Sequence, residues 1–156
     1  MAVVAFVSTV LGATIGALAN YILAVRRERS ERERDSRVHA VEVKRAARLI
    51  DLELLKAQSL AGIATNKRYW VPEPDAQISS DVWRQYAVTI SAELSYQAWV
   101  LVAKAFQAAE HINGSRALQL SGVLRDQPIS DDNAQAISVM QTDVIRGREA
   151  LVPLMT

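Results

Sequence analysis

The chain contains no cysteine and only two histidines, His39 and His111, which lie far apart in the sequence. The absence of cysteine excludes a disulfide framework, thiol catalysis and metal sites built from thiolates. Glu110 is adjacent to His111 rather than three residues before it, so the pair lacks the Glu-x-x-His spacing of carboxylate metal bundles. The sequence therefore predicts neither a metal site nor a cofactor.

Motifs for nucleotide binding and nucleophilic catalysis are also absent. No G-x-S-x-G sequence occurs, and Gly12 and Gly16 lie in an apolar run rather than between a strand and a helix. One alternative stays open, a carboxylate-only site formed by Glu53 and Glu93 inside a helical domain. Without further chemistry, we predict a protein that is not an enzyme and has no small-molecule substrate.

The most informative feature that is present is an apolar run. Ala2–Val25 covers 24 residues without a formal charge, and Arg26 and Arg27 end it. As a helix this run is about 36 Å long, and the hydrocarbon core of a bilayer is about 30 Å thick. We predict a single transmembrane helix over residues 1–25, with the bilayer as its first partner.

Basic residues flank only the C-terminal end of this run. Under the positive-inside rule, this asymmetry places the N-terminus outside the cell membrane and the rest of the chain in the cytoplasm. Arg26 and Arg27 are expected to contact lipid headgroups. Two alternatives remain, a buried helix of a soluble protein and a secreted helical domain released by cleavage near Ala19, where Ala17-Leu18-Ala19 resembles a signal-peptidase site. Cleavage is disfavoured because no basic residue precedes the run, and because apolar residues continue past Ala19.

One face of the apolar run carries small residues at every fourth position: Ser8, Gly12, Gly16 and Asn20. Small residues let two transmembrane helices approach closely, and G-x-x-x-G is a known dimer pattern. The face therefore predicts a homo-oligomer or contact with another membrane protein. Abundant glycine and alanine in apolar helices is the simpler explanation of the same pattern.

Residues 26–37 form a charged segment with six arginines, four acids and no apolar residue. We predict a solvated helical stalk supported by pairs four residues apart, namely Glu28–Arg32, Arg29–Glu33 and Glu33–Arg37. Residues 38–156 hold 12 basic and 13 acidic residues. A domain so close to neutral lacks the basic surface that nucleic-acid binding needs, so we predict that nucleic acid is not a partner.

Residues 38–156 show helical spacing of apolar positions and no convincing strand pattern. We expect helices over 38–64, from Ser79 or Ser80 to about residue 90, from Ser95 to a stop at Asn113-Gly114, over 116–124, and from Ser130 onward. The predicted fold class is all-α. A transmembrane helix continues through the stalk into a four- to five-helix cytoplasmic bundle.

Two prolines interrupt the helical pattern in the loop Arg68–Asp75. Its residues Tyr69, Trp70 and Pro72 are a candidate docking site for a partner. The competing interpretation is that the aromatic side chains fold back over the end of the bundle. Trp83 and Trp99 are read in the same two ways, as core residues or as part of a partner groove.

Several local motifs between Leu49 and Asn113 resemble a known group of proteins. They are Leu49-Ile50-Asp51-x-Glu53-Leu54, Tyr69-Trp70-x-Pro72, Trp83-x-x-Tyr86, and Leu94-Ser95 followed by Trp99. In these motifs the chain resembles small membrane-anchored all-helical proteins of high-GC Gram-positive bacteria and their phages. The resemblance covers less than half of the chain. It implies a helical fold with a membrane anchor and implies no functional residue.

Together these features predict a non-enzymatic, membrane-tethered interaction or scaffold protein that dimerises through its transmembrane helix. The alternatives are an accessory subunit of a larger membrane protein complex and the secreted domain described above.

Overall fold

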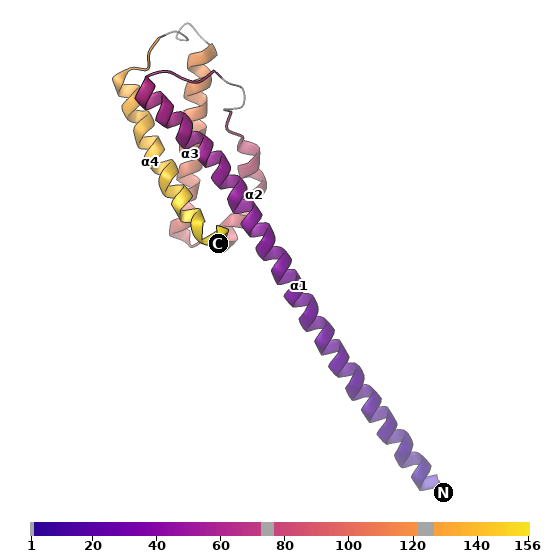
Figure 1. Ribbon diagram of the computed structural model, residues 1–156. Helices are drawn as coiled ribbons and strands as arrows, with labels where there is room; N and C mark the ends of the chain where they lie inside the picture. Colours follow the sequence, from indigo (N-terminus) through magenta and orange to yellow (C-terminus); the bar gives the residue numbers. More distant parts are fainter. Residues whose placement is uncertain (1, 73–76, 122–126) are drawn as a thin grey trace. The chain divides into compact units, whose positions relative to one another are not determined.

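The computed structural model describes the backbone of residues 2–72, 77–121 and 127–156, with side chains from residue 20 onward. Over these ranges the protein has four helices and no strand, which confirms the all-α prediction. The helices are α1 (Ala2–Lys67), α2 (Ser80–Glu93), α3 (Tyr96–Ser121) and α4 (Asp131–Met155) (Figure 1).

The chain divides into two compact units, residues 1–41 and 42–156. The second unit is a bundle in which the end of α1 packs with α2, α3 and α4 around one core. Among residues with described side chains, no helix has an apolar stretch long enough to cross a membrane. The transmembrane helix predicted over residues 1–25 lies mainly in residues 1–19, whose side chains are outside that description.

Within the bundle, α1 buries a face rich in alanine. Its buried side chains recur every three or four residues from Val43 to Ala64, and Ile50 and Leu54 are fully buried. This is the apolar spacing that the sequence shows, and it confirms the helix predicted over residues 38–64. Because alanine is small, the neighbouring helices can approach α1 closely.

Serine side chains fix the starts of the later helices, as the sequence predicts. Ser79 caps α2 by accepting a hydrogen bond from the backbone N–H of Asp81, at 3.3 Å. Ser95 accepts one from the N–H of Ala98, and Ser130 accepts one from the N–H of Asn133, each at 3.3 Å. These bonds satisfy backbone donors that a helix N-terminus leaves unpaired.

The residue that follows helix α1, Arg68, has a left-handed backbone conformation. Arg68 has a φ of 59°, and its backbone N–H donates to the carbonyl of Ala64 at 3.1 Å. Glycine is the usual residue at this helix-ending position. In a non-glycine residue the conformation costs about 1–2 kcal/mol. The Arg68 guanidinium pairs with Asp131 at 2.7 Å, but both side chains are exposed, so this pair contributes little to stability.

The predicted stop at Asn113-Gly114, and the separate helix after it, are wrong. Helix α3 continues through both residues to Ser121, and residues 122–124 lie outside the description. Ile112 and Arg116 are both buried on either side of the predicted stop. Their tertiary contacts hold the backbone helical and outweigh the cost of a glycine inside a helix, about 1 kcal/mol.

Helices α3 and α4 approach each other closely at Gly147. A Cβ placed on Gly147 would lie 2.2 Å from the Cβ of Ala105 and 3.0 Å from the carbonyl oxygen of Leu101. Only glycine therefore fits at this crossing. Fully buried Val102 and Val144 belong to the same two helices, so the contact is part of the core.

A polar clamp joins α4 to α1. The guanidinium of Arg148 donates to both carboxylate oxygens of Asp51, at 2.7 and 3.2 Å, and to the side-chain oxygen of Gln58 at 2.6 Å. The Gln141 side chain donates to the carbonyl of Gln58 at 3.3 Å. Because the paired side chains are only 26% and 18% exposed, water screens this ion pair less than it screens a surface pair.

Candidate functional site

The predicted association face lies almost entirely outside the described side chains. Ser8, Gly12 and Gly16 are among residues 1–19, and only Asn20 of the four can be placed. Asn20 lies on α1 and is exposed. The structure therefore does not test whether this face associates.

The end of the apolar run is described, and its large side chains are exposed. Tyr21, Ile22, Leu23 and Val25 are between 45% and 67% exposed. Successive residues of a helix are about 100° apart, so these side chains point in different directions around α1. A helix that packs against a protein normally keeps a polar outer face. A single protein contact would therefore not cover all four side chains.

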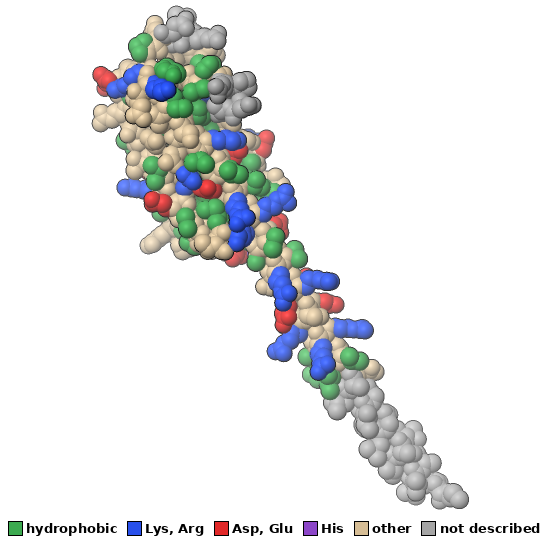
Figure 2. Space-filling view, viewed as in Figure 1, with side chains coloured by type: hydrophobic (Ala, Val, Ile, Leu, Met, Phe, Trp, Pro, Cys, Tyr) green, Lys and Arg blue, Asp and Glu red, His purple; other side chains and the backbone are tan. Residues whose placement is uncertain are grey.

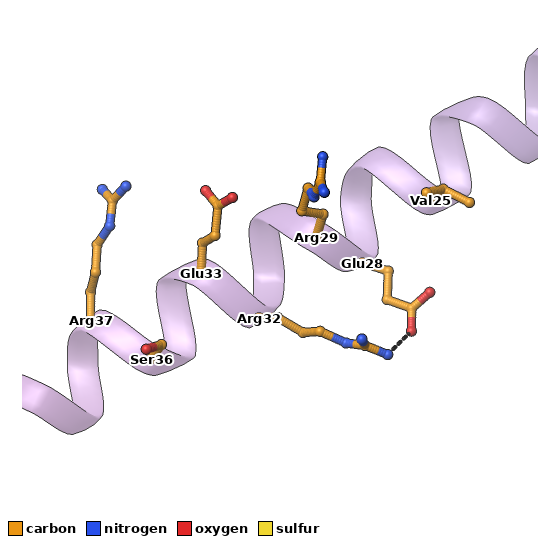
Figure 3. Close-up of a pocket in the computed structure, with 7 residues that line it drawn as sticks. All are labelled: Val25, Glu28, Arg29, Arg32, Glu33, Ser36 and Arg37. Carbon is orange, nitrogen blue, oxygen red and sulfur yellow. Dashed lines mark hydrogen bonds and ion pairs between the residues drawn. The ribbon is translucent and has the colours of Figure 1, made fainter.

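The arginines after this run form one of the three expected ion pairs. Arg32 pairs with Glu28. No ion pair joins Arg29 to Glu33 or Glu33 to Arg37, although these three side chains leave the helix on the same side (Figure 3). The hollow that these residues line follows one helix and is open to solvent, so it is not an enclosed binding cavity. Arg26 and Arg27 are likewise exposed.

The predicted docking residues of the loop Arg68–Asp75, called the prolyl loop below, are partly buried in the core and partly on the surface. Trp70 is only 5% exposed and belongs to the core, whereas Tyr69 and Pro72 lie on the surface. The guanidinium of buried Arg116 donates to the carbonyl of Val71 at 2.8 Å. Trp70 therefore folds back into the core of the bundle, whereas Tyr69 is the exposed aromatic side chain of this loop.

Trp70 also forms part of a groove at this end of the bundle. The groove has a volume of about 270 Å³ and lies between α3 and α4. Ile129, Ile137 and Met140 supply apolar surface, while Ser115, Gln119 and Asn133 supply polar groups. Its size suits one or two side chains of a partner rather than an extended ligand.

The other two tryptophans are partly buried and belong to an aromatic stack between α2 and α3. Trp83 of α2 stacks against Trp99 with ring centroids 5.2 Å apart, and against Phe106 with centroids 4.7 Å apart. Trp99 and Phe106 are seven residues apart on α3, which separates them by about 10.5 Å along the helix. The Trp83 ring therefore lies between the two α3 rings and packs against the edge of the core.

The two carboxylates considered for a shared site lie far apart. Glu53 is buried and accepts hydrogen bonds from the Lys56 ammonium and from the backbone N–H of Ser79, both at 2.8 Å. Ser79 immediately precedes α2, whereas Glu93 is the last residue of that 14-residue helix and is exposed. A helix of this length spans about 20 Å, so Glu53 and Glu93 cannot share one ion.

Over the described part of the chain, no group of three or more His, Cys, Asp or Glu side chains is placed to hold a metal ion. His39 and His111 are both exposed.

Sequence reasoning missed three polar residues that organise the bundle. Arg116 anchors the prolyl loop, and Arg148 with Gln58 joins α4 to α1. In the sequence these residues occupy ordinary polar positions of amphipathic helices, so no local signal distinguishes them from solvated side chains.

The chain was also compared with known proteins. No family model, no curated protein and no solved structure matched it.

Proposed function

We propose that the protein is a non-enzymatic, membrane-tethered interaction or scaffold protein. Its apolar run Ala2–Val25 spans the bilayer once, the N-terminus is outside and the helical bundle is in the cytoplasm. The observation that carries this proposal is the exposure of Tyr21, Ile22, Leu23 and Val25 in different directions around α1. Burial of such a side chain is worth about 1.5–3 kcal/mol, and lipid chains supply that burial from every direction.

Two surfaces are available for interaction under this proposal. The small-residue face Ser8, Gly12, Gly16 and Asn20 associates with a second copy or with another membrane protein. In the bundle, exposed Tyr69 and the groove beside Trp70 are the contact for a partner.

Membrane extraction tests the anchor. We expect the protein to remain with the membrane pellet after alkaline carbonate treatment, because a spanning helix is not removed by breaking electrostatic contacts. Recovery in the supernatant would reject the anchor. An intact mass that corresponds to a chain starting at Asn20 would establish the secreted alternative instead.

Cysteine labelling tests the orientation, and the cysteine-free chain supplies a control without background. A membrane-impermeant maleimide is expected to label an Ala2→Cys variant in intact cells. A Ser138→Cys variant in the bundle should react only after the cells are permeabilised. Labelling of Ser138→Cys in intact cells would reverse the proposed orientation.

Crosslinking in membranes tests the association face. Gly12→Leu and Gly16→Leu are expected to weaken a crosslinked dimer, because a large side chain keeps the helices apart. Thr14→Leu is the matched control, since residue 14 lies about 200° around the helix from each glycine. An unchanged dimer in both glycine variants would exclude this face. Purification with one stoichiometric unrelated protein would favour the accessory-subunit alternative.

A further inference from the structure

We infer that Arg26, Arg27 and Arg29 form an arginine collar that binds the phosphate groups of anionic phospholipids. This inference rests on the proposed function, because it needs a bilayer around the apolar run. It goes further by giving the protein a lipid preference and a charge arrangement that produces it.

The axial positions of the collar match the headgroup layer. With a rise of about 1.5 Å per residue, the three arginines lie about 1.5, 3 and 6 Å beyond Val25. The polar layer on each side of a bilayer is about 5–8 Å thick. Arg34 and Arg37 lie about 13.5 and 18 Å beyond Val25. They therefore lie outside this layer, whereas the three arginines of the collar lie within it.

The angular positions separate the collar from the nearest acid. At about 100° per residue, Arg26, Arg27 and Arg29 share one arc of about 160°, and Glu28 lies on the opposite side of the helix. Glu28 is paired with Arg32, which lies one turn further from the apolar run. Figure 3 shows this pair on the other side of α1 from Arg29.

This pairing changes the charge that a lipid meets. Over residues 26–37 as a whole, four acids nearly balance six arginines, and the basic and acidic side chains lie beside one another in Figure 2. In the layer next to the apolar run, three arginines accompany one acid, and Arg32 compensates that acid. No ion pair joins Arg26, Arg27 or Arg29 to another described side chain, so their guanidinium groups are available to a ligand.

The chemistry of the collar favours anionic lipids over zwitterionic ones. A guanidinium group donates two parallel hydrogen bonds to the oxygens of a phosphate. In phosphatidylcholine a choline cation competes for the same phosphate, whereas phosphatidylglycerol carries no cation of its own. Each arginine close to an anionic surface strengthens attraction about five-fold.

The test is the preference of the full chain for phosphatidylglycerol over phosphatidylcholine. The protein is reconstituted into vesicles that contain both lipids and extracted in a mild detergent, and the bound lipids are measured by native mass spectrometry. The wild-type chain is expected to retain phosphatidylglycerol in excess of its share in the vesicle. Retention of both lipids in proportion to the vesicle would overturn the inference.

Two double variants with the same loss of charge locate the site. Arg27→Gln with Arg29→Gln is expected to lower the preference by up to about 30-fold. Arg34→Gln with Arg37→Gln should lower it much less, because those residues lie outside the headgroup layer and their attraction to the phosphates is partly screened. An equal loss in both double variants would show that net charge, and not the collar, sets the preference.

A second pair of variants tests the role of the Glu28–Arg32 pair. Arg32→Gln leaves Glu28 uncompensated and should lower the preference, and Glu28→Gln in the same chain should restore it. Carbonate extraction of every variant separates this inference from the proposed function. A chain that stays in the membrane without a lipid preference defeats the collar alone, whereas a wild-type chain absent from the membrane defeats both.

Discussion

Gly147→Ala is expected to destabilise the bundle, although alanine is the better helix former by about 1 kcal/mol. The new Cβ would lie 2.2 Å from the Cβ of Ala105. Non-bonded carbon atoms are normally about 3.5–4.0 Å apart, so α3 and α4 must separate by more than about 1 Å. That shift loosens the contacts of fully buried Val102 and Val144.

Overpacking of this kind costs about 1–3 kcal/mol, and the better helix propensity of alanine offsets about 1 kcal/mol of it, so we expect a net loss of about 1 kcal/mol. A loss of about 1 kcal/mol in a domain of this size lowers Tm by about 4 °C. Urea titration followed by tryptophan fluorescence measures the loss directly. All three tryptophans lie in residues 42–156, so the signal reports the bundle rather than the N-terminal unit.

Two further variants isolate the steric cause. Ala105→Gly removes the 2.2 Å contact, so it should cost less stability in the Gly147→Ala chain than the same substitution costs in the wild-type chain. Gly114→Ala is the matched control, because a Cβ there meets no atom within 4 Å, and it should stabilise the bundle by about 0.5–1 kcal/mol. The reasoning is refuted if Gly147→Ala is as stabilising as Gly114→Ala.

Three other substitutions test separate contacts, each by the same urea titration. Arg148→Ala should cost about 1.5–3 kcal/mol, because it removes charge-assisted hydrogen bonds to partly buried Asp51; a loss below about 0.5 kcal/mol would class the clamp with surface pairs. Arg68→Gly should be about 1 kcal/mol more stable than Arg68→Ala, because only glycine adopts a φ of 59° without strain; equal stabilities would remove the strain argument. Trp83→Ala should cost about 2–3 kcal/mol, less than the range of about 3–5 kcal/mol for a fully buried tryptophan, because it removes a partly buried ring stacked between two others; a loss below about 1 kcal/mol would mean that the rings pack loosely.

The sequence predicted those features of the fold that neighbouring residues control. The helical faces follow from apolar spacing within one segment, and the starts of α2, α3 and α4 follow from Ser79, Ser95 and Ser130. Each of these serines bonds a backbone N–H two or three residues away. Such signals are complete within a few residues, so they can be read without knowledge of the rest of the chain.

The local sequence gave a wrong prediction at Asn113-Gly114, where it indicated the end of a helix. These residues commonly end a helix, but buried Ile112 and Arg116 hold α3 together on both sides. The burial depends on the prolyl loop and the other helices, which the local sequence does not specify. The length of α3 therefore depends on tertiary contacts and not on the local sequence.

Some features of the candidate sites also follow from the sequence, and others only from the tertiary structure. The sequence alone shows the apolar run Ala2–Val25, the arginines that follow it and the absence of cysteine. These features depend only on which residues are present. Only the tertiary structure placed Trp70 in the core and separated Glu53 from Glu93. Those outcomes depend on which distant or flexible side chains meet in space. Charge and hydropathy patterns determine what a segment can do, and packing decides which side chains remain available to do it.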